Sequence, residues 1–333
     1  MNLFIRVLTA LSCLILSIGA LAQSAPNDPV KEGQQLTAAK KYAEAIEKYK
    51  AALTAEPTNA NANYQMAYAL YLSGKGASGI PYLDKAVKGN TSPQFIAGAY
   101  SLLGSIYSSN KQLPLAIEAY KNGIKEDTAN KRIYYNLGIV YYRSKLYNDA
   151  QQTLLKALQL DNHYTDAQRM YALAAFHQNK RVDAVLGFCR FLQLEPNTTR
   201  SAEAFGNLQA ILQGGALKPE QGYRPDAATK LAANWQMQLV GKALLGFATR
   251  RYASPTDLLT AQLKAVFEAA ANDNKYKYAF ANYYKALSQS DNVEAFARII
   301  SLKAIPENQK WLDSNRDKKL SYEDWMKSTA VTL

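Results

Sequence analysis

Two stretches decide the fold: Ala116-Ile-Glu-Ala-Tyr120-Lys-Asn-Gly123 and Ala150-Gln-Gln-Thr-Leu154-Leu-Lys-Ala157. Each begins with a small residue, has a large apolar or aromatic residue four positions later, and has a second small residue three positions after that. Similar groups begin at Ala45, Gly79 and Ala184, so the five copies are spaced by 34, 37, 34 and 34 residues. A regular period of this length indicates stacked repeats rather than an ordinary helical bundle.

A matching set of apolar and small residues precedes each copy. It is clearest in Leu103-Gly104 and Leu137-Gly138, and it is weaker around Gly33, Met66 and Tyr171. Each copy is therefore predicted to be a pair of helices, in which small residues allow close approach and large residues fill the space between pairs. No pair can bury its apolar face alone, so neighbouring pairs must stack into a continuous core.

This pattern resembles the tetratricopeptide repeat (TPR) family over residues 26–198. The resemblance implies an all-α fold, a TPR α-solenoid of five helix-turn-helix repeats. Residues 199–213 are expected to form a capping helix, because no matching second helix follows them. Glycine and proline residues mark 214–226 as a linker. Residues 227–333 are expected to form a C-terminal helical region without the repeat.

Members of the TPR family bind extended or helical peptides in a concave groove lined by the first helices of their repeats. The resemblance therefore implies a protein or peptide partner for this chain. Tyrosine and arginine suit such a groove, because they offer a large contact area with a polar end. The alternative is that the tyrosines belong to the core. The groove residues that the resemblance assigns are Tyr64, Tyr68, Tyr71, Tyr135, Tyr142, Arg143, Arg169, Phe176 and His177.

The first 22 residues have the features of a signal peptide. Arg6 precedes an apolar run over 7–20, and Ala20-Leu21-Ala22 matches a cleavage site. A retained membrane anchor is the alternative, although the apolar run is too short to span a bilayer comfortably. We therefore expect an exported protein, periplasmic or associated with the cell envelope, with no transmembrane segment in the mature chain.

The formal net charge of +12 does not by itself indicate a nucleic-acid partner. Basic residues are spread along the chain and interleaved with acidic ones, whereas a surface that follows phosphates needs them clustered. Export also argues against nucleic acid. Cys189 is the one cysteine that remains after the predicted cleavage, so no internal disulfide can form and stability must come from packing.

Residues 313–324 weakly resemble the calcium-binding loop of an EF-hand, which needs oxygen ligands at fixed positions. Lys318 replaces the glycine of the sharp turn, and Asp324 replaces a longer glutamate, so any calcium binding is expected to be weak. The alternative is a polar helix–turn–helix in which Ser321 caps the last helix. The candidate ligands are Asp313, Asn315, Asp317, Ser321 and Asp324, with the backbone carbonyl of Lys319.

Three hypotheses about function follow. The first is an exported TPR scaffold that is not an enzyme and needs no cofactor. It agrees with the absence of a catalytic motif, since neither His163 nor His177 has a serine and a carboxylate at motif spacing. The second is an envelope enzyme, which predicts a pocket of converging titratable groups with shifted pKa values around 227–333. The third is a calcium-stabilised structural module.

Overall fold

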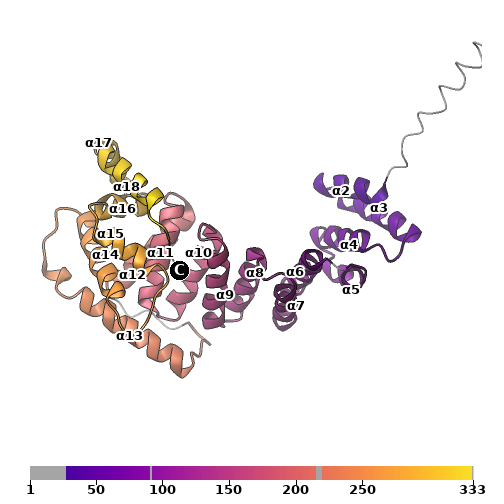
Figure 1. The fold of residues 1–333 in the computed structure, drawn as a ribbon, viewed down its shortest axis with the longest axis horizontal. Coiled ribbons are helices and arrows are strands. Elements are labelled where there is room, and N and C mark those ends of the chain that lie inside the picture. The colour runs from indigo at the N-terminus through magenta and orange to yellow at the C-terminus, as the bar shows by residue number, and fades with distance from the viewer. Residues whose placement is uncertain (1–27, 91, 215–219, 332) are drawn as a thin grey trace, which may run out of the picture. The chain divides into compact units, whose positions relative to one another are not determined.

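The computed structural model describes residues 28–90, 92–214, 220–331 and 333. All regular elements in these ranges are helices, which confirms the all-α fold (Figure 1). The predicted signal peptide, residues 1–22, lies outside the described residues, as do the first positions of the predicted repeats and part of the predicted linker. The chain divides into two compact units, one up to Asn110 and one from Lys111 onward.

In the first unit, consecutive helices pack against each other in chain order. The helices are α2 (Pro29–Ala38), α3 (Tyr42–Ala55), α4 (Ala60–Leu72), the short 3-10 helix η1 (Gly76–Gly79), α5 (Ile80–Lys88) and α6 (Pro93–Ser109). Asp28, Asn59 and Ser92 begin α2, α4 and α6, because each side chain accepts a hydrogen bond from a backbone N–H of the first turn. The first helix of each pair therefore has a defined start.

Small residues bring the helices of a pair together, as the sequence pattern predicts. A Cβ atom added at Gly33 of α2 would overlap the ring of Tyr49 on α3. The Tyr49 hydroxyl also lies 3.1 Å from the hydroxyl oxygen of Thr37, so the ring is fixed in this position. In the second unit, a Cβ atom at Gly138 would lie 2.6 Å from Cγ of Leu154. These glycines are needed for close packing.

The turn between the two helices of each pair has the same backbone conformation throughout the repeats. One residue of each turn has a positive φ: 61° at Lys40, 80° at Gly74, 60° at Lys111, 59° at Lys145 and 57° at Asn179. A left-handed residue at this place ends the first helix and reverses the chain direction. The recurring turn is the structural counterpart of the sequence period.

The second unit begins with further pairs of helices and continues into the C-terminal region. Its repeat helices are α7 (Leu113–Glu126), α8 (Lys131–Arg143), α9 (Tyr147–Leu160), α10 (Thr165–His177) and α11 (Arg181–Leu194), and α12 (Thr199–Leu212) follows them. The C-terminal elements are α13 (Ala227–Ala243), the 3-10 helix η2 (Phe247–Thr249), α14 (Pro255–Ala271), α15 (Ala281–Ser288), α16 (Val293–Ile300), α17 (Glu307–Ser314) and α18 (Arg316–Ser328).

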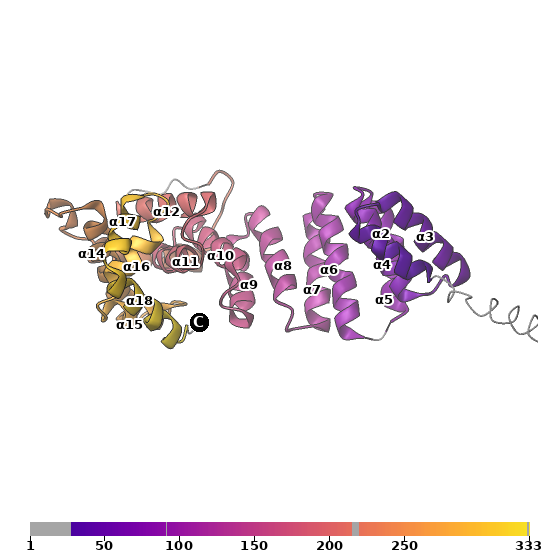
Figure 2. The same cartoon turned by 90° about the horizontal axis from the view of Figure 1, so that it is seen from above.

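Helix α11 is the centre of the second unit. Every residue from Arg181 to Gln193 is buried, and the helix packs against α10, α12, α13, α14 and α16. The views in Figures 1 and 2 both place α10, α12, α14 and α16 around α11. Such a helix must be apolar on most of its faces. The C-terminal region is therefore packed onto the last repeat and covers its second helix, α11.

A buried polar network also connects the last repeat to the C-terminal region. The Gln193 side-chain amide lies 2.6 Å from the hydroxyl oxygens of both Tyr283 and Tyr322, which belong to α15 and α18. Arg190 donates to the Gln193 side-chain oxygen at 2.8 Å, and its guanidinium lies 5.7 Å from the Tyr283 ring centre. These contacts fix the position of α15 and α18 on α11.

No helix within the described ranges has the length and apolar character needed to cross a membrane.

Candidate functional site

Three of the predicted groove residues lie on α4 in the first unit. Tyr68 is 37% exposed, whereas Tyr64 and Tyr71 are half-buried and pack against the apolar core formed with α5 and α6. The Tyr64 ring stacks on Tyr68 with centres 6.5 Å apart, and it lies 5.5 Å from the ring of Phe95 on α6. We call Tyr64, Tyr68 and Phe95 the aromatic surface. It joins the first helices of two successive repeats.

The other predicted groove residues lie in the second unit, and several of them contact other parts of the chain. Tyr135 is half-buried, with its ring 5.1 Å from that of Tyr164 at the start of α10. Burial raises the pKa of Tyr135. The guanidinium of Arg169 pairs with Glu203 of α12 at 2.6 Å, and Arg143 is exposed. Arg169 is therefore already bound by the helix that follows the last repeat.

Phe176 and His177 end α10, and the structure places them differently. The Phe176 ring lies 5.9 Å from the fully buried ring of Phe188, so Phe176 partly completes the core. His177 instead stacks on Tyr147 with centres 4.9 Å apart, and Tyr142 meets the rings of both His177 and Tyr147 edge-on. Tyr142, Tyr147 and His177 thus form one group of three rings that contact one another.

A segment of the predicted linker binds at this aromatic group. The Glu220 carboxylate accepts a hydrogen bond from the Tyr147 hydroxyl and lies 3.2 Å from Nδ1 of His177. The ammonium group of Lys145 lies 3.3 Å from the other oxygen of Glu220, and it also donates to the backbone carbonyl of Gln221 at 2.5 Å. We call Lys145, Tyr147 and His177 the carboxylate cradle.

The electrostatics of the cradle favour a charged carboxylate. The hydrogen bond from Tyr147 is the largest influence that lowers the pKa of Glu220, and Lys145 and His177 add to it. Burial raises the pKa of Tyr147, with a further contribution from Glu220, so the hydroxyl keeps its proton at neutral pH. Burial lowers the pKa of His177, although Glu220 opposes this. Burial also raises the pKa of Tyr142 to about 12.

Of the three cradle residues, the sequence predicts only His177, as a groove residue. Lys145 and Tyr147 belong to a turn and to the start of a second helix, where no groove residue was expected. Glu220 lies in a segment that the glycine and proline content marked only as a linker. No local sequence pattern could predict the contact of Glu220 with the cradle, because Glu220 is more than 40 residues away from each cradle residue along the chain.

A polar cavity of about 310 Å³ lies where α13 meets α9 and α11. The buried ammonium group of Lys180 donates to the side-chain oxygens of Asn148 and Gln151 at 3.0 and 3.1 Å. Asp183, also buried, accepts from the Gln236 side chain at 2.9 Å and from the Tyr171 hydroxyl at 3.3 Å. The bond from Gln236 attaches α13 to the last repeat, and the bonds of Lys180 reach α9.

The two buried charged groups of this cavity, Lys180 and Asp183, have pKa values that burial shifts in opposite directions. Burial lowers the pKa of Lys180 and raises the pKa of Asp183, while the hydrogen bond from Gln236 acts against the shift of Asp183. The second functional hypothesis predicted converging titratable groups with shifted pKa values near the C-terminal region. This cavity has such groups, but amide and hydroxyl groups of the same chain already satisfy them.

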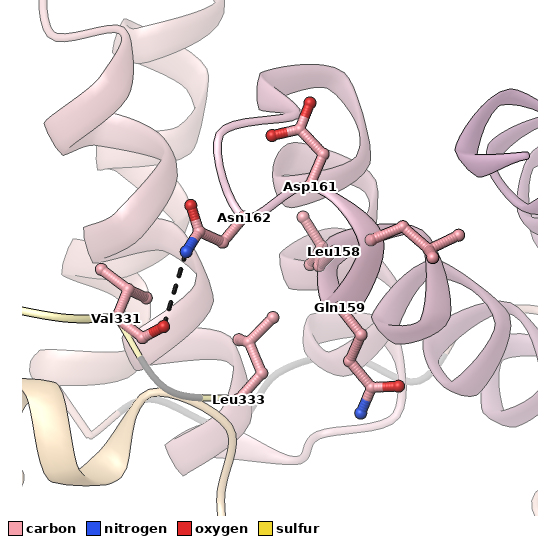
Figure 3. Close-up of a pocket in the computed structure, with 7 residues that line it drawn as sticks. Leu158, Gln159, Asp161, Asn162, Val331 and Leu333 are labelled. Carbon is pink, nitrogen blue, oxygen red and sulfur yellow. Dashed lines mark hydrogen bonds between the residues drawn. The ribbon is translucent and has the colours of Figure 1, made fainter. Parts of the chain in front are cut away.

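A second cavity, of about 430 Å³, lies where the turn after α9 meets the last residues of the chain. Leu158, Gln159 and Asn162 face Val331 and Leu333 across it (Figure 3). The Asn162 side chain donates to the Val331 carbonyl at 3.5 Å. The lining includes the side-chain carboxylate of Asp161, whose pKa is lowered chiefly by a hydrogen bond from Lys131. The lining provides no group of catalytic residues.

The predicted calcium-binding loop has a different conformation. Asn315 separates α17 from α18, and α18 is continuous from Arg316, so most of residues 313–324 are helical. The Asp313 carboxylate accepts a hydrogen bond from Gln309, and the Ser321 hydroxyl donates to Asn292. The expectation of a loop is therefore wrong in this structure. Lys318 continues the helix where an EF-hand has its turn-forming glycine.

The six candidate ligands consequently point to separate partners or lie along one helix. Across the parts of the chain that the structure describes, no group of three or more histidine, cysteine, aspartate or glutamate side chains is placed to hold a metal ion. Calcium binding stays a prediction. The candidate ligands concerned are Asp313, Asn315, Asp317, Lys319, Ser321 and Asp324.

Comparison with known proteins identifies the repeats. Models of the tetratricopeptide repeat match residues 36–95 and 131–164, and a TPR repeat model matches residues 104–145. The type IV pilus assembly protein PilF of Pseudomonas aeruginosa is 30% identical over 104 residues. The match covers 30% of this chain and 41% of the length of that relative.

Two solved structures also match this chain in part. A crystal structure of MamA is 26% identical, with a TM-score of 0.46, and the match covers 49% of this chain and 94% of MamA. The Pseudomonas aeruginosa PilF structure is 17% identical, with a TM-score of 0.49, and the match covers 63% of this chain and 89% of that one. With the family models that match residues 36–95 and 104–164, the paired helices and their recurring turns show that the chain contains tetratricopeptide repeats over these residues.

Proposed function

We propose that this protein is an exported, non-catalytic scaffold that binds a segment of another polypeptide through the first helices of its repeats. The observation that carries the proposal is the aromatic surface of α4 and α6. Tyr68 is exposed there although Tyr64 and Phe95 lie beside it. Exposed aromatic side chains that adjoin one another mark interaction surfaces more often than isolated ones do.

Tyrosine side chains suit this task for a physical reason. A tyrosine ring gives a large contact area but loses little conformational entropy on binding, and its hydroxyl can pair with a peptide backbone. On α4 the ring of Tyr68 lies outside the core, while Met66, Ala67 and Leu70 of the same helix are buried. The helix can therefore offer Tyr68 to a partner without exposing its own core.

The proposal of export rests on residues 1–22 and on the similarity to PilF, which is named as a type IV pilus assembly protein. A pilus is assembled in the cell envelope, so a related repeat protein working there would agree with a signal peptide. The matched part of PilF is less than half of that protein. For this chain we propose only a location in the periplasm or cell envelope and a partner that is a protein or peptide.

The alternative of an envelope enzyme receives less support. The polar cavity beside α13 contains Lys180 and Asp183, but Lys180 is already bonded to Asn148 of α9, and Asp183 is already bonded to the Gln236 side chain of α13. A catalytic group needs a free position next to its substrate, with geometry that permits proton transfer or attack. The cavity is better explained as a structural junction.

The calcium-stabilised module requires α18 to lose its first turns, because helical residues cannot form the EF-hand loop. Trp311 and Trp325 flank the segment, so their fluorescence would report the change. A titration to millimolar calcium, followed by fluorescence and by far-ultraviolet circular dichroism, tests this. A fluorescence change with loss of helix would support the module, and the lack of any response would discard it.

The scaffold proposal is tested with peptides selected from a random phage-displayed library on the immobilised mature protein. We expect selected peptides to lose at least tenfold in affinity when Tyr64 and Tyr68 are both replaced by alanine, because two adjoining anchors of about 1–2 kcal/mol each are removed. Leu115→Ala is the matched control, since Leu115 is 41% exposed but lies on a second helix. Equal binding by the double variant and the control, with unchanged melting temperatures, would contradict the proposal.

A further inference from the structure

All three residues of the carboxylate cradle belong to the repeats, whereas the residue that they bind, Glu220, lies outside the repeats. Lys145 lies in the turn between α8 and α9, Tyr147 begins α9, and His177 ends α10. Glu220 comes from a segment outside any helix that follows the repeats and α12. The repeats thus hold a glutamate in the way that a receptor holds a ligand, through three side chains that converge on one carboxylate.

The same segment supplies a second anchor. The Tyr223 ring meets the Tyr147 ring edge-on, with centres 4.9 Å apart. Within the segment, the Tyr223 N–H donates to the Glu220 carbonyl at 3.1 Å, so a turn brings the two side chains to one side. The occupant therefore presents a carboxylate and an aromatic ring three residues apart, and the cradle has a complementary partner for each.

The chemistry of the cradle selects for a carboxylate. A lysine ammonium group and a tyrosine hydroxyl are hydrogen-bond donors, and hydrogen bonds to a charged group are shorter and stronger than those between neutral groups. Glu220 keeps 33% of its side chain exposed, so most of its bonding is to the cradle and not to a surrounding core. A glutamate of another polypeptide could make the same contacts.

We propose that the cradle binds partner segments with a glutamate followed three residues later by an aromatic residue, and that residues 220–223 are an internal competitor for this site. The proposal rests on the proposed function only in taking the ligand to be a polypeptide. The internal segment is covalently attached, so its effective concentration at the cradle is high. A partner binds fully only when the internal segment leaves.

The test uses the mature full chain and a fluorescein-labelled peptide with the sequence of residues 220–226, Glu-Gln-Gly-Tyr-Arg-Pro-Asp. In the chain, Glu220→Gln and Tyr223→Ala together remove both anchors of the internal segment. We expect this opened variant to bind the peptide at least tenfold more tightly than the wild type. In the wild type the internal segment occupies the cradle most of the time, so the apparent affinity for an added peptide is reduced in proportion to the small fraction of free cradles. Fluorescence anisotropy measures both affinities.

Two matched controls define the contact. Adding Lys145→Met to the opened variant keeps the side-chain volume but removes the charge, and binding should fall by about tenfold, as for one charged hydrogen bond. A peptide with glutamine in place of its glutamate should show a similar loss on the opened variant. Peptide binding that is equal in the wild type and the folded opened variant, or insensitive to Lys145→Met, would overturn the proposal.

A second measurement applies if the opened variant does not fold. Tyr147→Phe in the wild-type chain removes only the hydroxyl that donates to Glu220, and hydrogen exchange at the Tyr223 N–H, which donates to the Glu220 carbonyl, should become at least tenfold faster. Unchanged exchange would overturn the internal contact. The Tyr64→Ala and Tyr68→Ala substitutions should leave binding of the labelled peptide to the opened variant unaltered, so failure of the aromatic surface and failure of the cradle are distinguishable.

Discussion

Replacing Phe188 with alanine is expected to lower the free energy of unfolding of the second unit by about 3–5 kcal/mol. Phe188 is fully buried in α11, and α11 packs against α10, α12, α13, α14 and α16. Truncation removes apolar contact and leaves a cavity that surrounding helices cannot readily fill, because they are held on several sides. Urea denaturation followed by tryptophan fluorescence measures the change.

Tryptophan fluorescence is a selective probe for this experiment. All three tryptophans of the chain, Trp235, Trp311 and Trp325, lie in the second unit. The control is Leu115→Ala in the same unit, which should change the stability by less than about 0.5 kcal/mol because Leu115 is exposed. A similar small effect for Phe188→Ala would mean that α11 is not the centre of a packed core.

Replacing Asp183 with alanine is expected to cost about 2–4 kcal/mol, because two buried donors lose their acceptor and each costs about 1–3 kcal/mol. The donors are the Gln236 side chain and the Tyr171 hydroxyl. The change also removes a carboxylate close to the buried ammonium group of Lys180, whose pKa it supports. The unfolding transition of the second unit gives the loss.

Asp183→Asn separates the loss of charge from the loss of an acceptor. Asparagine keeps one side-chain oxygen, so it should cost only about 1 kcal/mol, the net value of a single hydrogen bond. Hydrogen exchange should show that the alanine variant exposes the amides of α13, which Gln236 attaches to α11. Equal and small losses for the two variants, with α13 still protected, would show that this network does not fix α13.

Most of the repeat architecture could be predicted from the sequence, because its signal is local and repeated. Ala150 and Leu154 are fully buried, and Gly138 packs where a side chain would overlap Leu154. Each of these residues faces its helix partner within a short stretch of chain. The spacing of small and large residues is therefore enough to predict which residues pack between the two helices of a pair. The turns, with a left-handed residue at the same place, follow from this geometry.

The carboxylate cradle could not be predicted in the same way. Lys145 and Glu220 are far apart in the sequence, and their contact depends on how the chain returns after α12. In the segment 313–324, by contrast, the sequence predicted a loop that the structure does not have. Its oxygen-bearing residues have the spacing of a calcium loop, but Lys318 and its neighbours favour a helix, and backbone hydrogen bonding decides the conformation.

The position of the C-terminal region narrows where a partner can bind. It covers α11, and α12 pairs with Arg169 through Glu203, so part of the predicted groove is already in contact with the chain itself. His177 likewise holds the linker segment, and Tyr142 packs against the His177 ring. On α4, by contrast, Tyr68 remains exposed. The aromatic surface is therefore the part of the predicted groove on which we base the proposed function.

Site-specific photo-crosslinking tests that central claim most directly. A photoreactive phenylalanine analogue is placed at Tyr68 in one variant and at Leu115 in another, and each is irradiated with the peptide selected from the library. We predict that the peptide is crosslinked at position 68, on the first helix α4, and not at position 115, on the second helix α7. Crosslinking at position 115 alone, or equal crosslinking at both positions, would contradict binding through the first helices.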